Sequence, residues 1–148
     1  MKKVELTSKI ITGLKTRTKN SDEMNPETAK IGSLWQNFFV EVVPTLENPS
    51  VPMYGVYTNY ESDAMGEFDL LVGVENLEAS DKLTSVTLKE GNYLCFESKG
   101  EMPQAIIETW GEIWAYFSDE NCTEKRAYGT DFELYLSQSE AEIYIGVE

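Results

Sequence analysis

The segment Asp131–Leu136 alternates between polar and apolar residues with a period of two. This alternation predicts a strand with Phe132 and Leu134 on one face and Glu133 and Tyr135 on the other. A buried carboxylate without a partner is costly to ionise, and a cation that fills the site would neutralise it. Glu133 is therefore a candidate binding residue for a cation. The alternative is an ordinary strand residue on a solvated face.

Aromatic side chains are the second group that could contact a ligand, because the faces of their rings attract cations. The chain has 3 Trp, 8 Tyr and 6 Phe. Tyr135 shares the predicted face of Glu133. The other candidates are on predicted helices and strands: Trp35, Phe38, Trp110, Trp114, Tyr54, Tyr57 and Tyr93. Each of them could equally be a core residue, since a tryptophan stripe at helical spacing is usually buried.

The charge of the chain favours cationic over anionic ligands. The formal net charge is -14, from 26 acidic and 12 basic residues. Such a field repels the phosphates of DNA and RNA, so direct nucleic-acid binding is not expected. It attracts cations and raises their concentration at any cleft. The alternative reading of this charge is that it serves solubility alone.

Several kinds of chemistry lack their usual residues. Histidine is absent, which removes the commonest general base and the usual zinc ligand. Asp63, Glu67 and Asp69 form a loose acidic group whose spacing does not match a calcium loop. The sequence contains no phosphate-binding loop, dinucleotide fingerprint or hydrolase elbow. We therefore expect neither a metal nor a cofactor.

The sequence also predicts where the protein resides. Its apolar runs are far shorter than the roughly 20 residues of a membrane-spanning helix. No apolar stretch follows the basic residues at the N-terminus, as a secretory signal would require. Cys95 and Cys122 lie in unlike settings, which favours reduced, unpaired thiols. We expect a cytoplasmic protein with no membrane association.

Two helices are predicted from apolar residues that recur at spacings of three and four. The first has Pro26 in its first turn and ends before Pro44, with Leu34, Trp35 and Phe38 on its apolar stripe. The second spans Pro103–Phe117. Strands are predicted around these helices at 3–19, 53–61, 68–75, 83–99, 130–136 and 141–148, with turns at 62–66 and 137–140.

The two halves of the chain match each other in order and in detail. Leu70–Glu75 lies 73 positions before the similar segment Ile143–Glu148, and Trp35 lies 75 positions before Trp110. We therefore predict an α+β fold of two β-α-β-β repeats, related by a pseudo-twofold axis, with an antiparallel sheet and two main helices. The repeats, at about 1–76 and about 82–148, would share one core in a single domain over residues 1–148.

This order of elements resembles the gyrase-inhibitor-like effector-binding family over essentially the whole chain. The resemblance rests on three segments, namely Gly91-Asn92-Tyr93, Phe132-Glu133-x-Tyr135 and Glu142–Ile145, together with the tryptophans of the second helix. The family includes the drug-sensing domains of AraC-type and MerR-type activators, and stand-alone proteins of integron gene cassettes that bind cationic drugs. The resemblance implies multidrug recognition, with Glu133 at the bottom of a ligand groove, where it meets the positive charge of the ligand.

Three functions follow from the residues and the resemblance. The first is a binding module for small aromatic organic cations, acting as a sensor or a sequestering protein. A partner transcription regulator could then supply any contact with DNA. The second is a protein inhibitor of a DNA-handling enzyme such as gyrase. The third is a small-molecule hydrolase in which Glu133 works with Tyr135 or Tyr93 as base and acid. We expect binding without catalysis.

Overall fold

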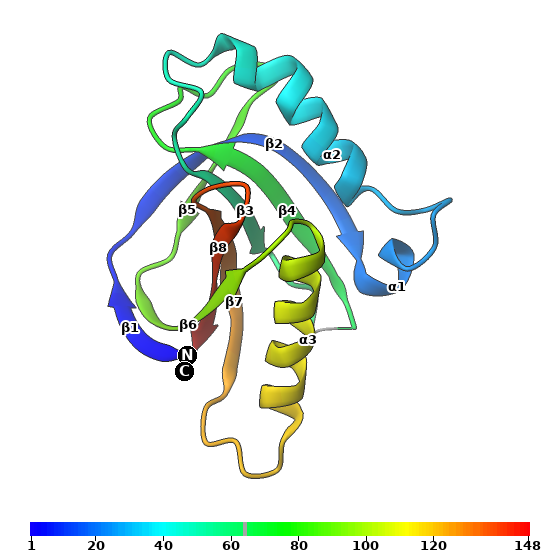
Figure 1. The fold of residues 1–148 in the computed structure, drawn as a ribbon, viewed down its shortest axis with the longest axis vertical. Coiled ribbons are helices and arrows are strands. Elements are labelled where there is room, and N and C mark those ends of the chain that lie inside the picture. Colours follow the sequence, from blue (N-terminus) through cyan, green and yellow to red (C-terminus); the bar gives the residue numbers. More distant parts are fainter. Residues whose placement is uncertain (64) are drawn as a thin grey trace.

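The computed structural model describes residues 1–63 and 65–148, so Ala64 of the predicted turn at 62–66 lies outside the described residues. All the strands of the described residues belong to a single antiparallel sheet of eight strands (Figure 1). Its strands are β1 (Lys2–Leu6), β2 (Lys9–Lys19), β3 (Met53–Thr58), β4 (Glu67–Val74), β5 (Thr84–Leu88), β6 (Gly91–Lys99), β7 (Arg126–Tyr135) and β8 (Glu140–Val147). The predicted α+β class and antiparallel sheet are confirmed.

The strand order in the sheet is β1-β6-β8-β7-β3-β4-β2-β5. Strands β1, β2, β3 and β4 of the first half correspond to β5, β6, β7 and β8 of the second. When corresponding strands are exchanged, the order is the same from either edge of the sheet. The halves meet at the central pair of β3 and β7, where Gly55 lies opposite Glu133. Each half also sends its first strand to the other half, because β1 pairs with β6 and β5 pairs with β2. The segments predicted as bent strands at 3–19 and 83–99 are thus two strands each.

The helices are α1 (Asn20–Glu23), α2 (Ile31–Asn37) and α3 (Gln104–Ser118). The first predicted helix was placed wrongly at both ends. It begins at Ile31, where the Glu23 carboxylate accepts the first free backbone N–H groups. It continues beyond Asn37 as a π-helical segment, η1 (Phe38–Val42), and a 3-10 turn, η2 (Val43–Thr45). Pro44 fits there because a new turn starts at η2, and the first residues of a turn need no N–H donor.

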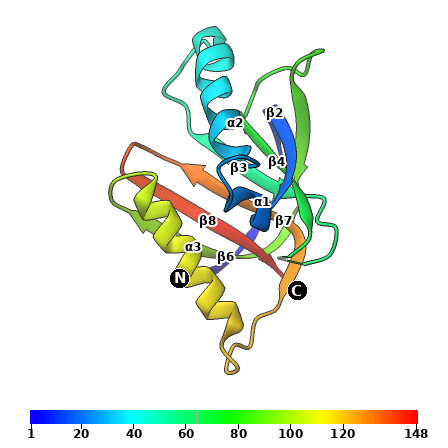
Figure 2. The ribbon, with the colours of Figure 1, turned by 90° about the vertical axis from the view of Figure 1, so that its right-hand side faces the viewer.

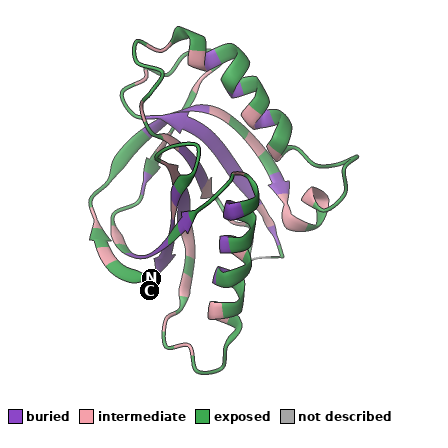
Figure 3. Cartoon of the chain, viewed as in Figure 1, coloured by how far each residue is buried: buried purple, intermediate pink, exposed green. Residues whose placement is uncertain are grey.

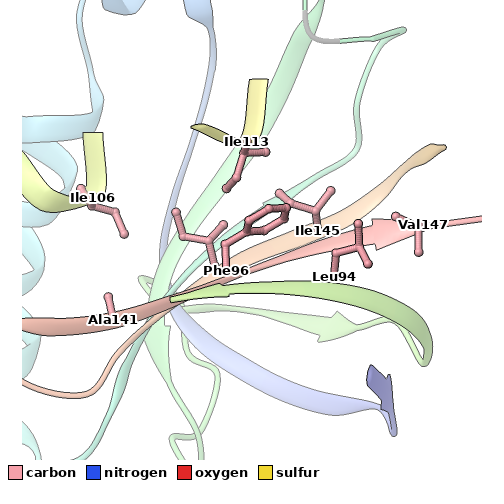
Figure 4. Close-up of a cluster of buried hydrophobic side chains, with 8 residues drawn as sticks. Leu94, Phe96, Ile106, Ile113, Ala141, Ile145 and Val147 are labelled. Atoms are coloured by element: carbon pink, nitrogen blue, oxygen red, sulfur yellow. The ribbon is translucent and has the colours of Figure 1, made fainter. Parts of the chain in front are cut away.

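Helices α2 and α3 cover the same face of the sheet, with the short α1 between them (Figure 2). Their sheet-facing residues are buried and their outer residues are exposed (Figure 3). Leu34 and Phe38 pack on the buried side chains of β4. Ile106 and Ile113 of α3 pack on Leu94, Phe96, Ile143 and Ile145 of β6 and β8 (Figure 4). The central strands β3 and β7 therefore lie between two separate helical cores.

A third apolar cluster occupies the opposite face of the sheet. It contains Ile11, Tyr54, Val56, Leu71, Leu88, Tyr93 and Phe132. Adjacent strand residues point to opposite faces, so Phe132 belongs to this cluster while Glu133 points toward the helices. Within the described part of the chain, no helix is both long and apolar enough to cross a membrane.

Candidate functional site

Glu133 lies on the helix-covered face of β7 and is only 4% exposed. Its carboxylate accepts three side-chain hydrogen bonds. Trp110 Nε1 donates to Oε2 at 2.6 Å, and the Tyr57 hydroxyl donates to the same oxygen at 3.0 Å. The Tyr135 hydroxyl donates to Oε1 at 2.9 Å. Two central strands and helix α3 thus place three neutral donors around one buried carboxylate.

Burial governs the acidity of this group. Loss of hydration raises the pKa of Glu133 above its ordinary value, and the hydrogen bonds from Trp110, Tyr135 and Tyr57 partly offset that rise. Burial and the neighbouring carboxylate also raise the pKa of Tyr57 and of Tyr135, so both hydroxyls stay protonated and act as donors. The site therefore stabilises negative charge by hydrogen bonds but supplies no positive charge of its own.

Glu133 differs in this respect from the other buried carboxylates of the described residues. Asp69 forms ion pairs with Arg17 and Lys15. Asp131 forms one with Arg126, at 2.7 Å between Nη2 and Oδ2. For Glu133 the described residues provide no basic partner within ion-pair distance. A ligand cation would supply the partner that this carboxylate lacks.

A groove of about 270 Å³ opens beside this carboxylate, between α1, α3 and the sheet. Trp110 and Tyr57 separate it from Glu133, with their ring centroids 5.4 Å apart in an edge-to-face contact. Trp114, 45% exposed, extends the same wall. We call this the α1–α3 groove; it is lined by Asn20, Glu23, Ile31, Tyr57, Tyr60, Phe68, Ile107, Trp110, Trp114 and Arg126. A flat cation there would lie one aromatic ring away from the carboxylate.

The opposite side of Glu133 is also aromatic. Trp35 meets Tyr135 edge to face with ring centroids 5.1 Å apart, and stacks on Phe39. Gly55 makes this arrangement possible, since a β-carbon there would come within 2.8 Å of Glu133 Oε1 and 3.4 Å of Trp35 Cζ2. Glu133 thus sits between aromatic groups contributed by both helices.

Gly55→Ala is expected to weaken cation binding about tenfold while the protein stays folded. The added methyl group would push Glu133 away from its donors, and a misplaced carboxylate loses most of the benefit of a hydrogen-bonded, preorganised site. Calorimetric titration with an aromatic cation measures the change. Gly111→Ala is the matched control, because nothing lies within 4 Å of a β-carbon at that exposed position. Equal affinities of the two variants would show that the position of the carboxylate is unimportant.

Three of the predicted site residues lie away from Glu133. Tyr54 and Tyr93 belong to the cluster on the opposite face of the sheet, where they line a separate cavity of about 90 Å³. Tyr54 and Tyr57 are three positions apart on one strand, so they cannot share a face, and grouping them in one site was wrong. Phe38, the first residue of η1, is fully buried in the core between α2 and the sheet. The structure brings Tyr57, Trp110 and Tyr135 into direct contact with Glu133, and Trp35 and Trp114 to its flanks.

Sequence reasoning missed several residues of the groove. Tyr60 lies just after β3 and Phe68 lies in β4. Ile107 lies one turn before Trp110 on α3. The position of Ile107 could have been inferred, since residues three or four apart share a helix face. Arg126 had no such indication, because its place in the groove depends on its pairing with Asp131. Among the described residues, no three potential ligand side chains are grouped to hold a metal.

Comparison with known proteins gives the family. Residues 4–147 match the model of the integron-associated effector binding proteins. The chain belongs to this family. An integron cassette protein from the mobile metagenome of Vibrio cholerae is 43% identical, with a TM-score of 0.92 over 99% of this chain and 95% of the other. The resemblance seen in the sequence is therefore confirmed.

More distant structures share the fold of this effector-binding protein. SAV2435, solved with bound tetraphenylphosphonium, is 21% identical, with a TM-score of 0.74 over 99% of this chain and 93% of its own. EcmrR, solved in a complex with DNA, is 10% identical with a TM-score of 0.64, and 99% of this chain matches 56% of EcmrR. No curated protein sequence matches the chain.

Proposed function

We propose that the protein binds lipophilic aromatic cations and acts as a sensor or sequestering protein for them. The observation that carries the proposal is Glu133, which is buried and hydrogen-bonded only to neutral donors. Paired with a cation, it would gain the Coulomb attraction that Asp69 and Asp131 already obtain from basic side chains. Delocalised organic cations suit this role, because they lose hydration more readily than a compact ammonium ion.

The groove supplies the second part of the proposed site. Aromatic rings beside a bound cation add about 0.5–2 kcal/mol each through cation–π contact. Three such rings, those of Trp110, Tyr57 and Trp114, line the groove. A structure with the same fold holds tetraphenylphosphonium, an aromatic cation, which supports the same ligand class here. The net charge of -14 would also concentrate cations near the protein.

Selectivity for charge is the expected behaviour of such a site. Carboxylate and ring faces favour positive charge and flatness but offer few directional contacts, so diverse aromatic cations should bind with roughly micromolar affinity. Neutral molecules of the same shape should bind at least tenfold more weakly. Calorimetric titration of 1-methylquinolinium and neutral 1-methylnaphthalene into the protein tests the proposal. Equal affinities for the cation and the neutral molecule would show that the site is an apolar cleft without selectivity for charge.

The affinity should also depend on pH. A cation binds the ionised form of Glu133, whose pKa is raised by burial, so protonation competes with the ligand. Affinity should therefore fall as pH is lowered through the raised pKa of Glu133. In the free protein the sign is opposite. Burial of Glu133 favours its protonated form, and the resulting contribution to folding stability is fully present below pH 4.5, the ordinary pKa of glutamate. This contribution is lost as pH rises through the raised pKa of the folded protein. Titration of 1-methylquinolinium from pH 8 to pH 4.5, with Glu133→Gln as the pH-independent control, measures the effect.

Binding without turnover is part of the proposal. A hydrolase would need a free acid and base beside the substrate, whereas the hydroxyls of Tyr57 and Tyr135 are both engaged with Glu133. We further propose that any effect on transcription passes through a partner regulator, since a chain of charge -14 is poorly suited to contact DNA. Inhibition of gyrase supercoiling in the absence of any small molecule would favour the inhibitor function instead.

A further inference from the structure

Arg126 is one of the residues that line the α1–α3 groove. Its side chain is 7% exposed, and Nη2 donates to Asp131. Its guanidinium carbon lies 4.6 Å from the ring centre of Tyr128 and 5.9 Å from that of Phe117. Packing and the ion pair thus fix the guanidinium group in the wall of the groove.

One donor of this guanidinium group is unused. The buried Nε–H of Arg126 has no hydrogen-bond partner among the described residues, where only the Ser98 hydroxyl shares this property. A buried polar group without a partner lowers stability, so such groups in a native protein commonly await a ligand, an ion or water. An acceptor atom held in the groove would satisfy the Nε–H.

Charge decides which kind of acceptor fits. The ion pair with Asp131 already neutralises Arg126, and Asp131 also accepts hydrogen bonds from Tyr60 and from the backbone of Gly146. An anionic acceptor would meet a neutral pair inside a protein of net charge -14. A neutral acceptor, such as an amide or ketone oxygen, avoids that repulsion and still accepts a charge-assisted hydrogen bond.

The sheet sets the spacing of the two carboxylates behind the groove. Asp131, which holds Arg126, and Glu133 are alternate residues on β7, so they point to the same face and lie roughly 7 Å apart along the strand. A single ligand of two fused rings spans this distance. Its positive end would lie against Trp110 and Tyr57 in front of Glu133, while its other end reaches Arg126.

We propose that the α1–α3 groove selects aromatic cations bearing a neutral hydrogen-bond acceptor roughly 7 Å from the positive charge. The charge would lie against Trp110 and Tyr57, one aromatic ring away from Glu133, and Arg126 Nε would donate to the acceptor. This inference rests on the proposed function. It adds a directional contact to a site otherwise selective only for charge and shape. Arg126 is then a residue that determines ligand specificity.

Three probes test it: 1-methylquinolinium, its 6-carboxamide and its 6-isopropyl analogue, in which the amide is replaced by an apolar group of similar shape. In the native protein the carboxamide should bind about tenfold more tightly than the isopropyl analogue, as expected for one hydrogen bond to a charged group. The ratio of the two affinities is the quantity to follow, because it cancels changes in the rest of the site.

Arg126→Lys should reduce this ratio to below about twofold, since lysine keeps the charge opposite Asp131 but has no N–H group along its stem. Arg126→Met with Asp131→Asn removes the ion pair as a unit and should do the same if the single variant folds poorly. Arg17→Lys is the matched control, because Arg17 pairs with Asp69 outside the groove and the tenfold ratio should persist.

The outcomes separate this inference from the function on which it rests. Binding of 1-methylquinolinium with no preference for the carboxamide overturns the inference alone. A preference that survives in both Arg126 variants overturns it as well. Failure of all three cations to bind the native protein overturns the proposed function and the inference together.

Discussion

Glu133→Gln should weaken the binding of aromatic cations by about 2–4 kcal/mol, roughly 30- to 1,000-fold, the range for removing one partner of a buried charge pair. The substitution removes the negative charge but keeps the shape of the side chain. The glutamine oxygen can still accept the bonds from Trp110 and Tyr57, and the Tyr135 hydroxyl can rotate to accept from the new amide. Calorimetry with 1-methylquinolinium measures the loss.

The same variant should not lose stability at neutral pH. Ionised Glu133 is buried without a basic partner, so replacing it by a neutral amide removes a desolvation penalty. Thermal unfolding at pH 7 should therefore show a melting temperature at or above that of the native protein. Affinity unchanged within twofold, in a variant that melts normally, would reduce Glu133 to an ordinary strand residue.

Trp110→Ala should weaken all aromatic cations together by about 1–3 kcal/mol, because the indole separates the groove from Glu133 and offers its face to a ligand. The substitution also removes a donor to the carboxylate. Trp110 packs against the core beneath α3, so circular dichroism and a melting curve must first establish that the variant is folded.

Trp110→Phe separates the two roles of the indole. Phenylalanine keeps an aromatic face but loses the N–H that lowers the pKa of Glu133. Most of the affinity at pH 8 should remain, while the fall in affinity on acidification should begin at a higher pH than in the native protein. An unchanged pH profile would indicate that the bond from Trp110 to Glu133 has no influence on the site.

The local features of the fold and site were predictable from the sequence. Period-two alternation placed Glu133 and Tyr135 on one face of β7, and the structure joins them by a hydrogen bond. Helical spacing identified α3 within one residue at each end. Similarity between the halves indicated the central pairing of strands, in which Gly55 lies opposite Glu133. Each of these depends on neighbours in the sequence or on the internal repeat.

Features that depend on distant contacts were not predictable in the same way. The exchange of β1 and β5 between halves is invisible in the alternation of either strand, because alternation does not specify the partner. The bond from Trp110 to Glu133 depends on how α3 lies across the sheet. Tyr54 was assigned to the site from its strand alone, although its separation from Tyr57 already placed it on the other face.

The negative charge of Glu133 is proposed to recognise the positive charge of the ligand. The most direct test compares 1-methylquinolinium with 1-methylnaphthalene in both the native protein and Glu133→Gln, under identical buffer and temperature. The cation should bind at least tenfold more tightly than the neutral molecule to the native protein, and this preference should disappear in the variant. An equal preference for the cation in both proteins would show that the charge is recognised elsewhere and not by Glu133.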